Sequence, residues 1–275
     1  MGIVPLLAIP RPGMPRLPPG WNAPKSAPCT HARLARERGR LIKGSLRLPP
    51  KGAPLITFQH YLEQWALLSL EKRDRLLSLV GDHQYELNLD AGTIRINEFE
   101  FPMQVIGTES DNTLTWLWAW AEEQTEIPEG LLDASLQLRQ WGMSQGLAEF
   151  TTPSIDLVRI DGSAIAMISA QVCKASCSFR DAYEGGAVHL LLFDRAIDSQ
   201  PSFDRARLVQ RLADVSSRYD LNHRGTLLSY LRLKGLSPLE QDGVISCELE
   251  SGERLNAEFD AAGGLTMING AAFIP

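Results

Sequence analysis

Ser144 lies in the stretch GMSQG (residues 142–146), which matches the G-x-S-x-G pattern of a nucleophile elbow. That pattern exposes a serine because a strand delivers it onto a strained turn ahead of a helix. Here the preceding residues, LLDASLQLRQW, are predicted to be helical, and Gly146 is typical of a helix C-cap. A serine hydrolase using Ser144 with His189 or His223 is therefore the alternative interpretation rather than the leading one.

Metal chemistry would need a cluster of soft or nitrogen ligands, and the sequence offers little of this kind. Cys173 and Cys177 are four residues apart and would share one face of a predicted helix. Two thiolates at this spacing need two further ligands, and no Cys or His pair is near them in sequence. The five histidines form no H-x-x-x-H pair. We expect no metal and no cofactor, and interpret both thiols as core or half-buried side chains.

Five residues are our candidates for ligand binding: Gln104, Thr108, Trp120, Arg139 and His189. Gln104 interrupts an apolar strand, and a buried amide must find hydrogen-bond partners, so it is either structural or one wall of a polar pocket. His189 lies inside another apolar strand. As a general base it would need a partner and a cleft, and a satisfied histidine of the core is the competing interpretation.

The stretch TWLWAWA (residues 115–121) contains three of the six tryptophans. Alternation along a strand would turn Leu114, Trp116, Trp118 and Trp120 to one face and leave both faces largely apolar. This pattern is typical of a strand covered on both sides. We predict that Trp118 belongs to the core. The competing interpretation is a stacking platform for a ligand, for which Trp120 is the better position.

Several elements must surround this strand. A helix is expected from an N-cap at Thr57 to Gly81, with a break near residues 71–74. Consecutive strands with short turns then predict an antiparallel meander. Further helices should begin at Pro128-Glu129 and at Asp161-Gly162, and residues 187–193 read as a buried strand.

The last part of the chain repeats this pattern on a smaller scale, with two helices and then a β-hairpin after residue 200. The expected fold is α+β: an antiparallel β-meander sheet covered by helices, mainly on one face, with a smaller C-terminal helix-plus-hairpin unit. We divide the chain into a tail (1–54), an α+β domain (55–200) and a C-terminal subdomain (201–275) that is either separate or integral to that domain.

The tail differs in composition from the rest of the chain. Residues 1–54 contain eleven of the 17 prolines, ten Lys or Arg residues and one acidic residue, Glu37. The remainder has 17 basic and 32 acidic residues, a net charge of −15, which makes a poor non-specific partner for nucleic acid. We expect a solvated tail without a stable fold, and the competing interpretation is a basic segment that contacts an anionic surface.

The central region resembles an uncharacterised bacterial family of unknown function. The resemblance rests on Q-x-x-G (residues 104–107) followed by T-W-L-W-A-W, with Leu89-Asp90 before them and FTTP (residues 150–153) after them. It covers about residues 56–195. It implies a bacterial soluble protein with no assigned activity, so it transfers no catalytic residue.

We expect a non-enzymatic binding or interaction module with a small ligand or a protein as its partner. No run of residues approaches the roughly 18 apolar residues of a membrane helix. The start of the chain lacks the features of a signal peptide, and the four cysteines lack the tight pairing of a disulfide framework. These patterns predict a cytoplasmic protein without a membrane span.

Overall fold

The computed structural model describes residues 57–122, 127–199, 205–249 and 252–273. All of them lie in one of the two units into which the chain divides, Leu55–Pro275. The expectations for the tail, residues 1–54, lie outside the described residues.

The first described element is helix α2, Phe58–Val80. The Thr57 side chain accepts a hydrogen bond from the His60 backbone N–H at 3.3 Å, which confirms the predicted N-cap. The helix ends at Gly81, whose φ of 62° suits glycine. The predicted break at residues 71–74 is wrong, because α2 is continuous there. Charged residues of this stretch have partners elsewhere in the fold: Glu71 accepts a hydrogen bond from Tyr230, and Asp74 accepts one from Arg211.

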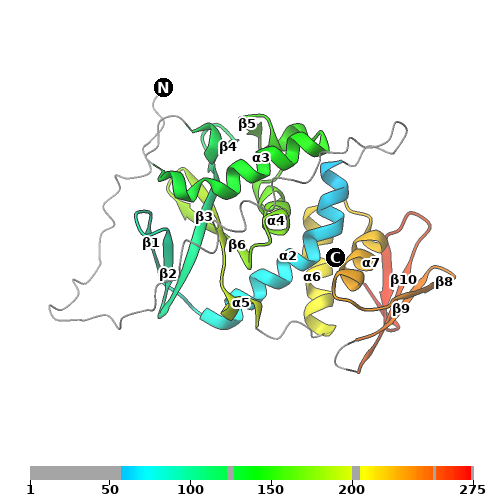
Figure 1. Cartoon of the computed structure of the whole chain (residues 1–275). Coiled ribbons are helices and arrows are strands. Elements are labelled where there is room, and N and C mark those ends of the chain that lie inside the picture. Colours follow the sequence, from blue (N-terminus) through cyan, green and yellow to red (C-terminus); the bar gives the residue numbers. More distant parts are fainter. Residues whose placement is uncertain (1–56, 123–126, 200–204, 250–251, 274–275) are drawn as a thin grey trace. The chain divides into compact units, whose positions relative to one another are not determined.

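The first sheet is antiparallel throughout and has seven strands, which confirms the predicted α+β class (Figure 1). Five follow one another in the order β1-β2-β3-β4-β5, while β7 pairs with β3 and β6 pairs with β7. The strands are β1 (Tyr85–Asn88), β2 (Thr93–Ile96), β3 (Phe99–Ser110), β4 (Thr115–Trp118), β5 (Ser154–Asp156), β6 (Cys177–Tyr183) and β7 (Gly186–Leu192). Pairings β1 to β4 form the predicted meander.

The long strand β3 organises this sheet. Its first residues pair with β2, and its last residues pair with β4 on one side and β7 on the other, so that Thr108 lies opposite both Leu117 and Val188. Gly107 is required here because a Cβ atom would lie 2.6 Å from the Leu117 carbonyl oxygen and 2.7 Å from the Trp116 ring. The indole of Trp116 therefore packs directly against the β3 backbone.

The helices of this part are α3 (Asp133–Gln145), α4 (Gly162–Val172) and the short α5 (Arg195–Asp198). The start predicted at Pro128-Glu129 is a 3-10 turn, Glu129–Leu131, and the α-helix begins four residues later than Glu129. The start predicted at Asp161 is confirmed: its side chain accepts from the Ala164 backbone N–H at 3.1 Å.

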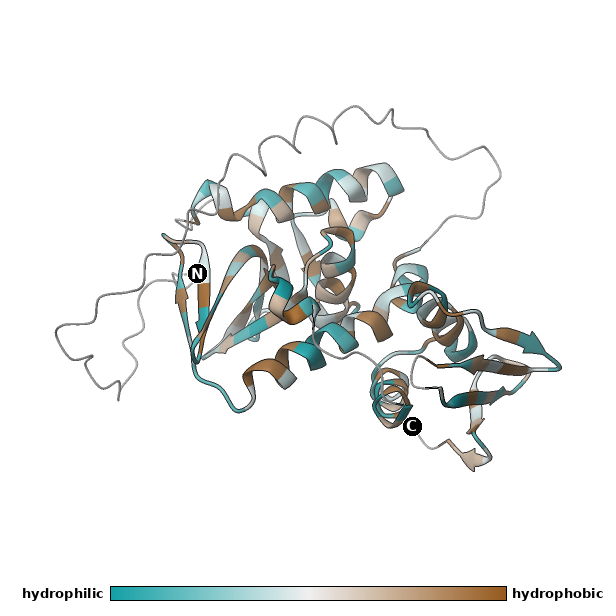
Figure 2. Cartoon of the chain, turned by 60° about the horizontal axis from the view of Figure 1, so that its bottom comes forward, coloured by the Kyte–Doolittle hydropathy of each residue, from teal (hydrophilic) through white to brown (hydrophobic). Residues whose placement is uncertain are grey.

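The two faces of the sheet belong to two apolar clusters, as the patterning of the tryptophan strand predicts. Trp116, Trp118 and Leu191 pack with residues of α2, α3 and α4 in the larger cluster. Val105 and Leu190 belong to a second cluster. Side chains of β1, β2, α5 and the end of α2 pack against them there. Hydrophobic residues line these strands, and the helices change from hydrophobic to hydrophilic around their circumference (Figure 2).

The C-terminal part contains helices α6 (Arg205–Arg218) and α7 (His223–Leu233) and a second antiparallel sheet. Its five strands follow in sequence order: β8 (Leu239–Gln241), β9 (Val244–Glu248), β10 (Arg254–Phe259), β11 (Leu265–Ile268) and β12 (Ala271–Ala272). The predicted hairpin is thus the β9–β10 pair of a longer meander. Leu208, Leu227 and Ile245 share the larger apolar cluster with Leu62 of α2, so α2 contributes to both parts.

Candidate functional site between helices α2 and α6

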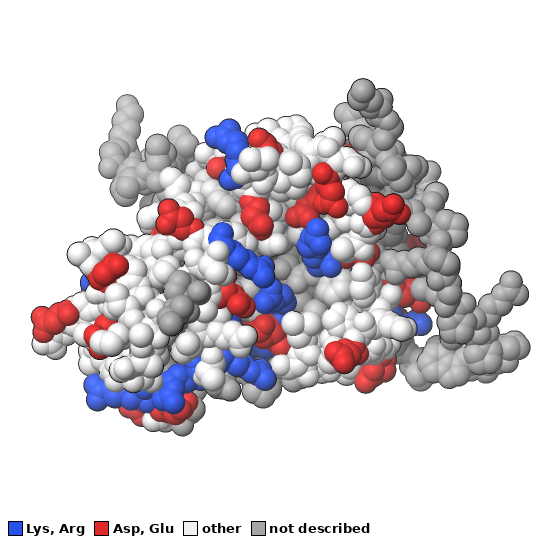
Figure 3. All heavy atoms as spheres, turned by 180° about the vertical axis from the view of Figure 1, so that it is seen from behind, with Lys and Arg blue, Asp and Glu red and all other residues white. Residues whose placement is uncertain are grey.

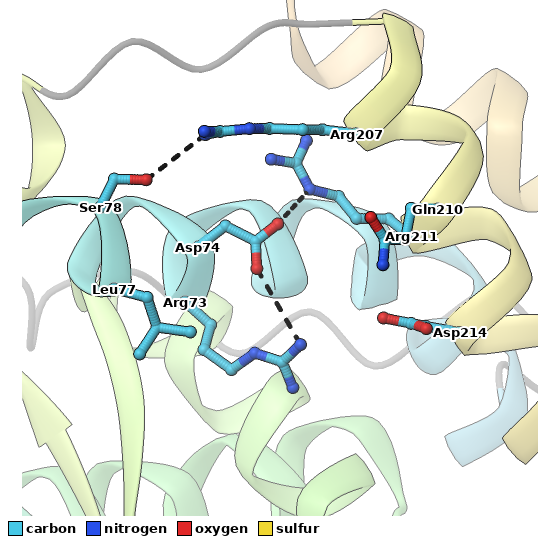
Figure 4. A pocket seen from close by; sticks show the side chains of 8 residues that line it. All are labelled: Arg73, Asp74, Leu77, Ser78, Arg207, Gln210, Arg211 and Asp214. Atoms are coloured by element: carbon cyan, nitrogen blue, oxygen red, sulfur yellow. Dashed lines mark hydrogen bonds and ion pairs between the residues drawn. The ribbon is translucent and has the colours of Figure 1, made fainter. Parts of the chain in front are cut away.

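A pocket of about 370 Å³ lies between α2 and α6 (Figure 4). This volume is near the lower end of the range for small-molecule sites. Four side chains of each helix line the pocket: Arg73, Asp74, Leu77 and Ser78 from α2, and Arg207, Gln210, Arg211 and Asp214 from α6.

Helical spacing explains why these side chains meet. On α6, Gln210 and Arg211 follow Arg207 by three and four residues and precede Asp214 by four and three, which places all four on one stripe of the helix. The adjacent stripe of α6 is apolar and buries Leu208, Leu212 and Val215 in the core. Packing of the apolar stripe therefore fixes the direction in which the polar stripe faces α2.

Arg211 is the anchor of the pocket. Its side chain is 4% exposed, and its Nε donates to Asp74 Oδ2 at 2.7 Å. Its buried Nη1 makes no hydrogen bond among the described residues and lies 3.8 Å from a carboxylate oxygen of Glu71. Two carboxylates of α2 therefore hold Arg211 in place as a fixed positive charge at this wall of the pocket.

The other two arginines are held more loosely. Arg207 Nη1 donates to the neutral Ser78 hydroxyl at 3.3 Å. Arg73 Nη2 is 3.9 Å from Asp74 Oδ1, and Asp74 already accepts the much closer Arg211. The pocket thus combines three arginines with two aspartates, and two of the arginines lack a close carboxylate.

Glu71 lies behind the pocket and is fully buried. Its carboxylate accepts from Arg75 Nη2 at 2.6 Å and from Lys234 Nζ at 3.1 Å, and the Tyr230 hydroxyl also donates to it. Burial, and then the Glu71 charge, raise the pKa of Tyr230. This cluster joins α2 to α7 and, through Arg211, to α6.

The predicted ligand residues lie elsewhere. The Gln104 amide donates through Nε2 to the Gly130 carbonyl oxygen at 2.8 Å and accepts through Oε1 from the Ala134 backbone N–H at 3.1 Å. It therefore joins strand β3 to the start of α3. Gln104 therefore has a structural role and not that of a pocket wall, because backbone groups hydrogen-bond to both the oxygen and the nitrogen of its amide.

Trp120 and Arg139 form a pair of their own. The Arg139 guanidinium lies 4.3 Å from the centroid of the half-buried Trp120 ring, a cation–π contact. The predicted alternation through Trp120 is wrong, because β4 ends at Trp118 and a 3-10 turn, Ala119–Ala121, follows. The Trp120 backbone N–H donates instead to the Ser135 hydroxyl at 2.9 Å. The turn thereby directs Trp120 towards α3.

His189 has the partner that its sequence context did not identify. Its Nε2 is 2.9 Å from Glu109 Oε1, and Arg180 donates to Glu109 Oε2 through Nε and Nη2 at 3.0 and 2.8 Å. Burial raises the pKa of Glu109, but the hydrogen bonds and charges of His189 and Arg180 outweigh it and hold this pKa below its usual value. His189 is 1% exposed and packs on Trp116, so the structure places it in the core. Thr108 lies in β3 beside this group and is half-buried.

Residues 59–195 match the model of DUF6882, a family of unknown function. The match agrees with the resemblance to a domain family without assigned activity. Neither a curated protein nor a solved structure matches the chain.

The matched region contains all five predicted ligand residues, but only half of the pocket. The α2 wall, from Arg73 to Ser78, lies inside residues 59–195, whereas α6 begins at Arg205. The pocket therefore depends on a helix that the DUF6882 match does not include.

Ser144 lies in the last turn of α3, which confirms the helical context predicted for it. Gly146 is the C-cap with a φ of 70°. The Ser144 hydroxyl donates to the Trp141 carbonyl oxygen at 2.7 Å and accepts from Gln145 Nε2 at 3.0 Å. His223 Nδ1 accepts from the Leu265 backbone N–H at 3.1 Å. Among the described residues, no hydrogen bond joins this serine to a histidine.

The placement of the cysteines corrects one prediction. Cys173 is the C-cap of α4 and Cys177 begins β6, so the two are not on one helix. The chain turns after α4 at Lys174, which has a φ of 53°. Burial raises the pKa of both thiols to about 12, and both are free. The prediction of core or half-buried thiols is confirmed.

Two further findings concern the described ranges as a whole. They contain no group of three or more His, Cys, Asp or Glu side chains arranged to hold a metal ion. Within the same ranges, every helix is too short or too polar to cross a membrane.

The arginines of the pocket are not among the site residues predicted from the sequence. One signal was present: Arg207, Arg211 and Asp214 recur at helical spacing beside the apolar stripe of α6. Two of the four facing residues, Arg73 and Asp74, lie in the stretch where a break in α2 was predicted.

Proposed function

We propose that this protein is a binding module that holds a small molecule bearing a carboxylate or phosphate group in the pocket between α2 and α6. The observation that carries the proposal is the presence of three arginines in one small pocket, two of them without a close carboxylate. Arginine suits this role because its planar guanidinium binds both oxyanions through paired hydrogen bonds.

The charge distribution supports an anionic ligand. Arg207 and Arg211 are one turn apart on α6, where like charges repel each other. Asp74 compensates the charge of Arg211. Arg207 pairs with no acidic side chain of the described residues, and its partner is the neutral Ser78 hydroxyl. An oxyanion between the helices would relieve this repulsion.

The site is also preorganised. Asp74 and the Glu71 cluster fix Arg211, and both walls are regular helices with apolar faces in the core. Rigid elements that hold binding groups before the ligand arrives reduce the entropy lost on binding.

The charges of the surrounding surface favour a small ligand over a nucleic acid. On the face shown in Figure 3, Lys and Arg side chains form a narrow band with acidic side chains on both sides of it. A broad basic surface is the usual footprint of nucleic-acid binding. The mixed face agrees with the net negative charge expected for this part of the chain.

Titration calorimetry of the full chain with inorganic phosphate and with succinate tests the proposal. Sodium chloride at matched ionic strength controls for screening. Arg207→Gln should weaken binding of either anion about tenfold, since a hydrogen bond to a charged group contributes roughly 1.5–3 kcal/mol. Arg232→Gln, an exposed change on α7 outside the pocket, should leave affinity unchanged. Equal affinities for the Arg207→Gln and parent proteins would contradict the proposal.

The proposal assigns binding without catalysis. The serine-hydrolase alternative requires Ser144 to react, although its hydroxyl is engaged by Trp141 and Gln145 in α3. Labelling of Ser144 by a fluorophosphonate probe, located by peptide mass spectrometry, would favour the alternative.

As compartment we propose the bacterial cytoplasm. The support is the resemblance to a bacterial family and the presence of three free thiols, Cys173, Cys177 and Cys247.

A further inference from the structure

Two aspartates line the pocket, and Asp214 is the one that pairs with no arginine of the described residues. It lies on α6 one turn beyond Gln210 and Arg211, and its side chain points into the pocket opposite Arg73 of α2 (Figure 4). The residue is half-buried. No hydrogen bond or ion pair of the described residues reaches its carboxylate, and no ion pair joins it to Arg73.

The neighbouring arginines are directed elsewhere. Arg211, three residues before Asp214, donates to Asp74. Arg207 reaches Ser78 on α2. A half-buried carboxylate without a partner is unfavourable, and in a site that binds anions it would also repel the ligand. Its position is explained if the ligand supplies a positive charge.

We propose that the ligand is a small zwitterion, with an oxyanion bound by Arg207 and Arg73 and an ammonium group bound by Asp214. This inference rests on the proposed function of the same pocket. An α-amino acid and an aminophosphonate both have this chemistry, because each joins an oxyanion and an ammonium group through a short carbon chain.

The other lining residues suit such a molecule. Gln210 lies between Arg207 and Asp214 on the same stripe of α6, and its amide can donate to an oxyanion and accept from an ammonium group. Leu77, which is 43% exposed, provides an apolar surface on α2 for the carbon chain. A volume of about 370 Å³ accommodates a molecule of this size.

Matched ligand pairs test the inference. 2-Aminoethylphosphonate and ethylphosphonate share the phosphonate and differ in the ammonium group; glutamate and glutarate form the corresponding carboxylate pair. Calorimetry on the full chain should show at least about tenfold tighter binding of the amine-bearing member of one pair. The pair that shows this preference identifies the oxyanion as phosphonate or carboxylate.

Asp214→Asn removes the charge at nearly constant volume. It should abolish the preference by weakening the amine-bearing ligand about tenfold, while the matched ligand without an amine binds as before or more tightly. Glu86→Gln, an exposed change on β1, is the control and should keep the preference. Thermal unfolding of each variant shows whether the fold is retained.

The outcomes separate the two proposals. If the members of both pairs bind equally and Arg207→Gln weakens them, the anion site stands and the zwitterion inference is overturned. If Arg207→Gln has no effect on any of the four ligands, or none of the four binds, both proposals fall. If Asp214→Asn leaves the preference intact, the ammonium group is bound elsewhere and the assignment of Asp214 is wrong.

Discussion

The Tyr230 hydroxyl on α7 donates a hydrogen bond to the Glu71 carboxylate on α2, 159 positions earlier in the chain. The two residues are 0% exposed. Lys234, the C-cap of α7, and Arg211 of α6 pair with the same carboxylate. Glu71 of α2 therefore contacts side chains from both helices of the C-terminal part.

The first prediction concerns this cluster. Glu71→Gln should lower the free energy of unfolding by about 3–5 kcal/mol, because Arg75 and Lys234 lose the buried carboxylate to which both donate. Tyr230→Phe should cost less, about 1.5–3 kcal/mol, since it removes one hydrogen bond to a charged group and removes no charge. Urea unfolding measures both. Similar stabilities of Glu71→Gln and the parent protein would show that the cluster is not a stabilising link.

The second prediction is a pH dependence at Glu109. Its folded-state pKa lies below its usual value of 4.5, so its contribution to stability is present above that value and is lost as the pH falls through the folded pKa. Glu109→Gln should therefore destabilise the protein at pH 7 by about 1–3 kcal/mol, because Arg180 and His189 lose a charged partner.

The difference between the parent protein and Glu109→Gln should shrink as the pH falls below 4.5. Urea unfolding between neutral and acidic pH measures this difference. The titration of the other carboxylates contributes equally to both proteins and cancels in the comparison. A difference that is constant across this range would contradict the assigned ion pairs.

These contacts show what the sequence can and cannot predict. The N-cap at Thr57, the start of α4 and the burial of Trp118 depend on local patterns, and all three are confirmed. The continuity of α2 at Glu71 depends on partners more than 130 positions away in the chain, such as Tyr230. A run of charged residues without visible partners resembles a solvated break, and the prediction was wrong for that reason.

The pocket shows the same limit. Arg211 and Asp74 are 137 positions apart, and only the packing of α6 on α2 brings them together. Residues chosen for interrupting apolar strands, such as Gln104 and His189, proved to bond with backbone or charged groups within the fold. A polar residue in an apolar strand signals a hydrogen-bond partner, and that partner is part of the protein itself in both of these cases.

The third prediction tests the close packing of α3. Alanine at position 142 would favour the helix by about 1 kcal/mol in an exposed setting. At Gly142, however, a Cβ atom would overlap the side chain of Phe150, which is 0% exposed. Gly142→Ala should therefore lower stability by about 1–3 kcal/mol through overpacking.

Gly130→Ala provides the control for this change, because a Cβ atom there has nothing within 4 Å. Its effect on stability should stay within about 0.5 kcal/mol. Thermal unfolding of the two variants compares them directly. A gain in stability for Gly142→Ala would show that Phe150 moves aside and that the contact is not tight.

The last prediction concerns the tryptophan strand, where core packing and ligand stacking make opposite demands. Trp118 is 0% exposed, its Nε1 donates to the Glu149 carbonyl oxygen at 3.0 Å, and its ring centroid lies 5.3 Å from that of Phe150. Trp118→Ala should therefore cost about 3–5 kcal/mol and give largely insoluble protein. Trp120→Ala should cost less, because that ring is half-buried and packs against Arg139. Urea unfolding of the soluble fraction of each variant shows which substitution lowers the free energy of unfolding more. A soluble Trp118→Ala variant that melts cooperatively near the parent temperature would show that this side chain is not part of the core.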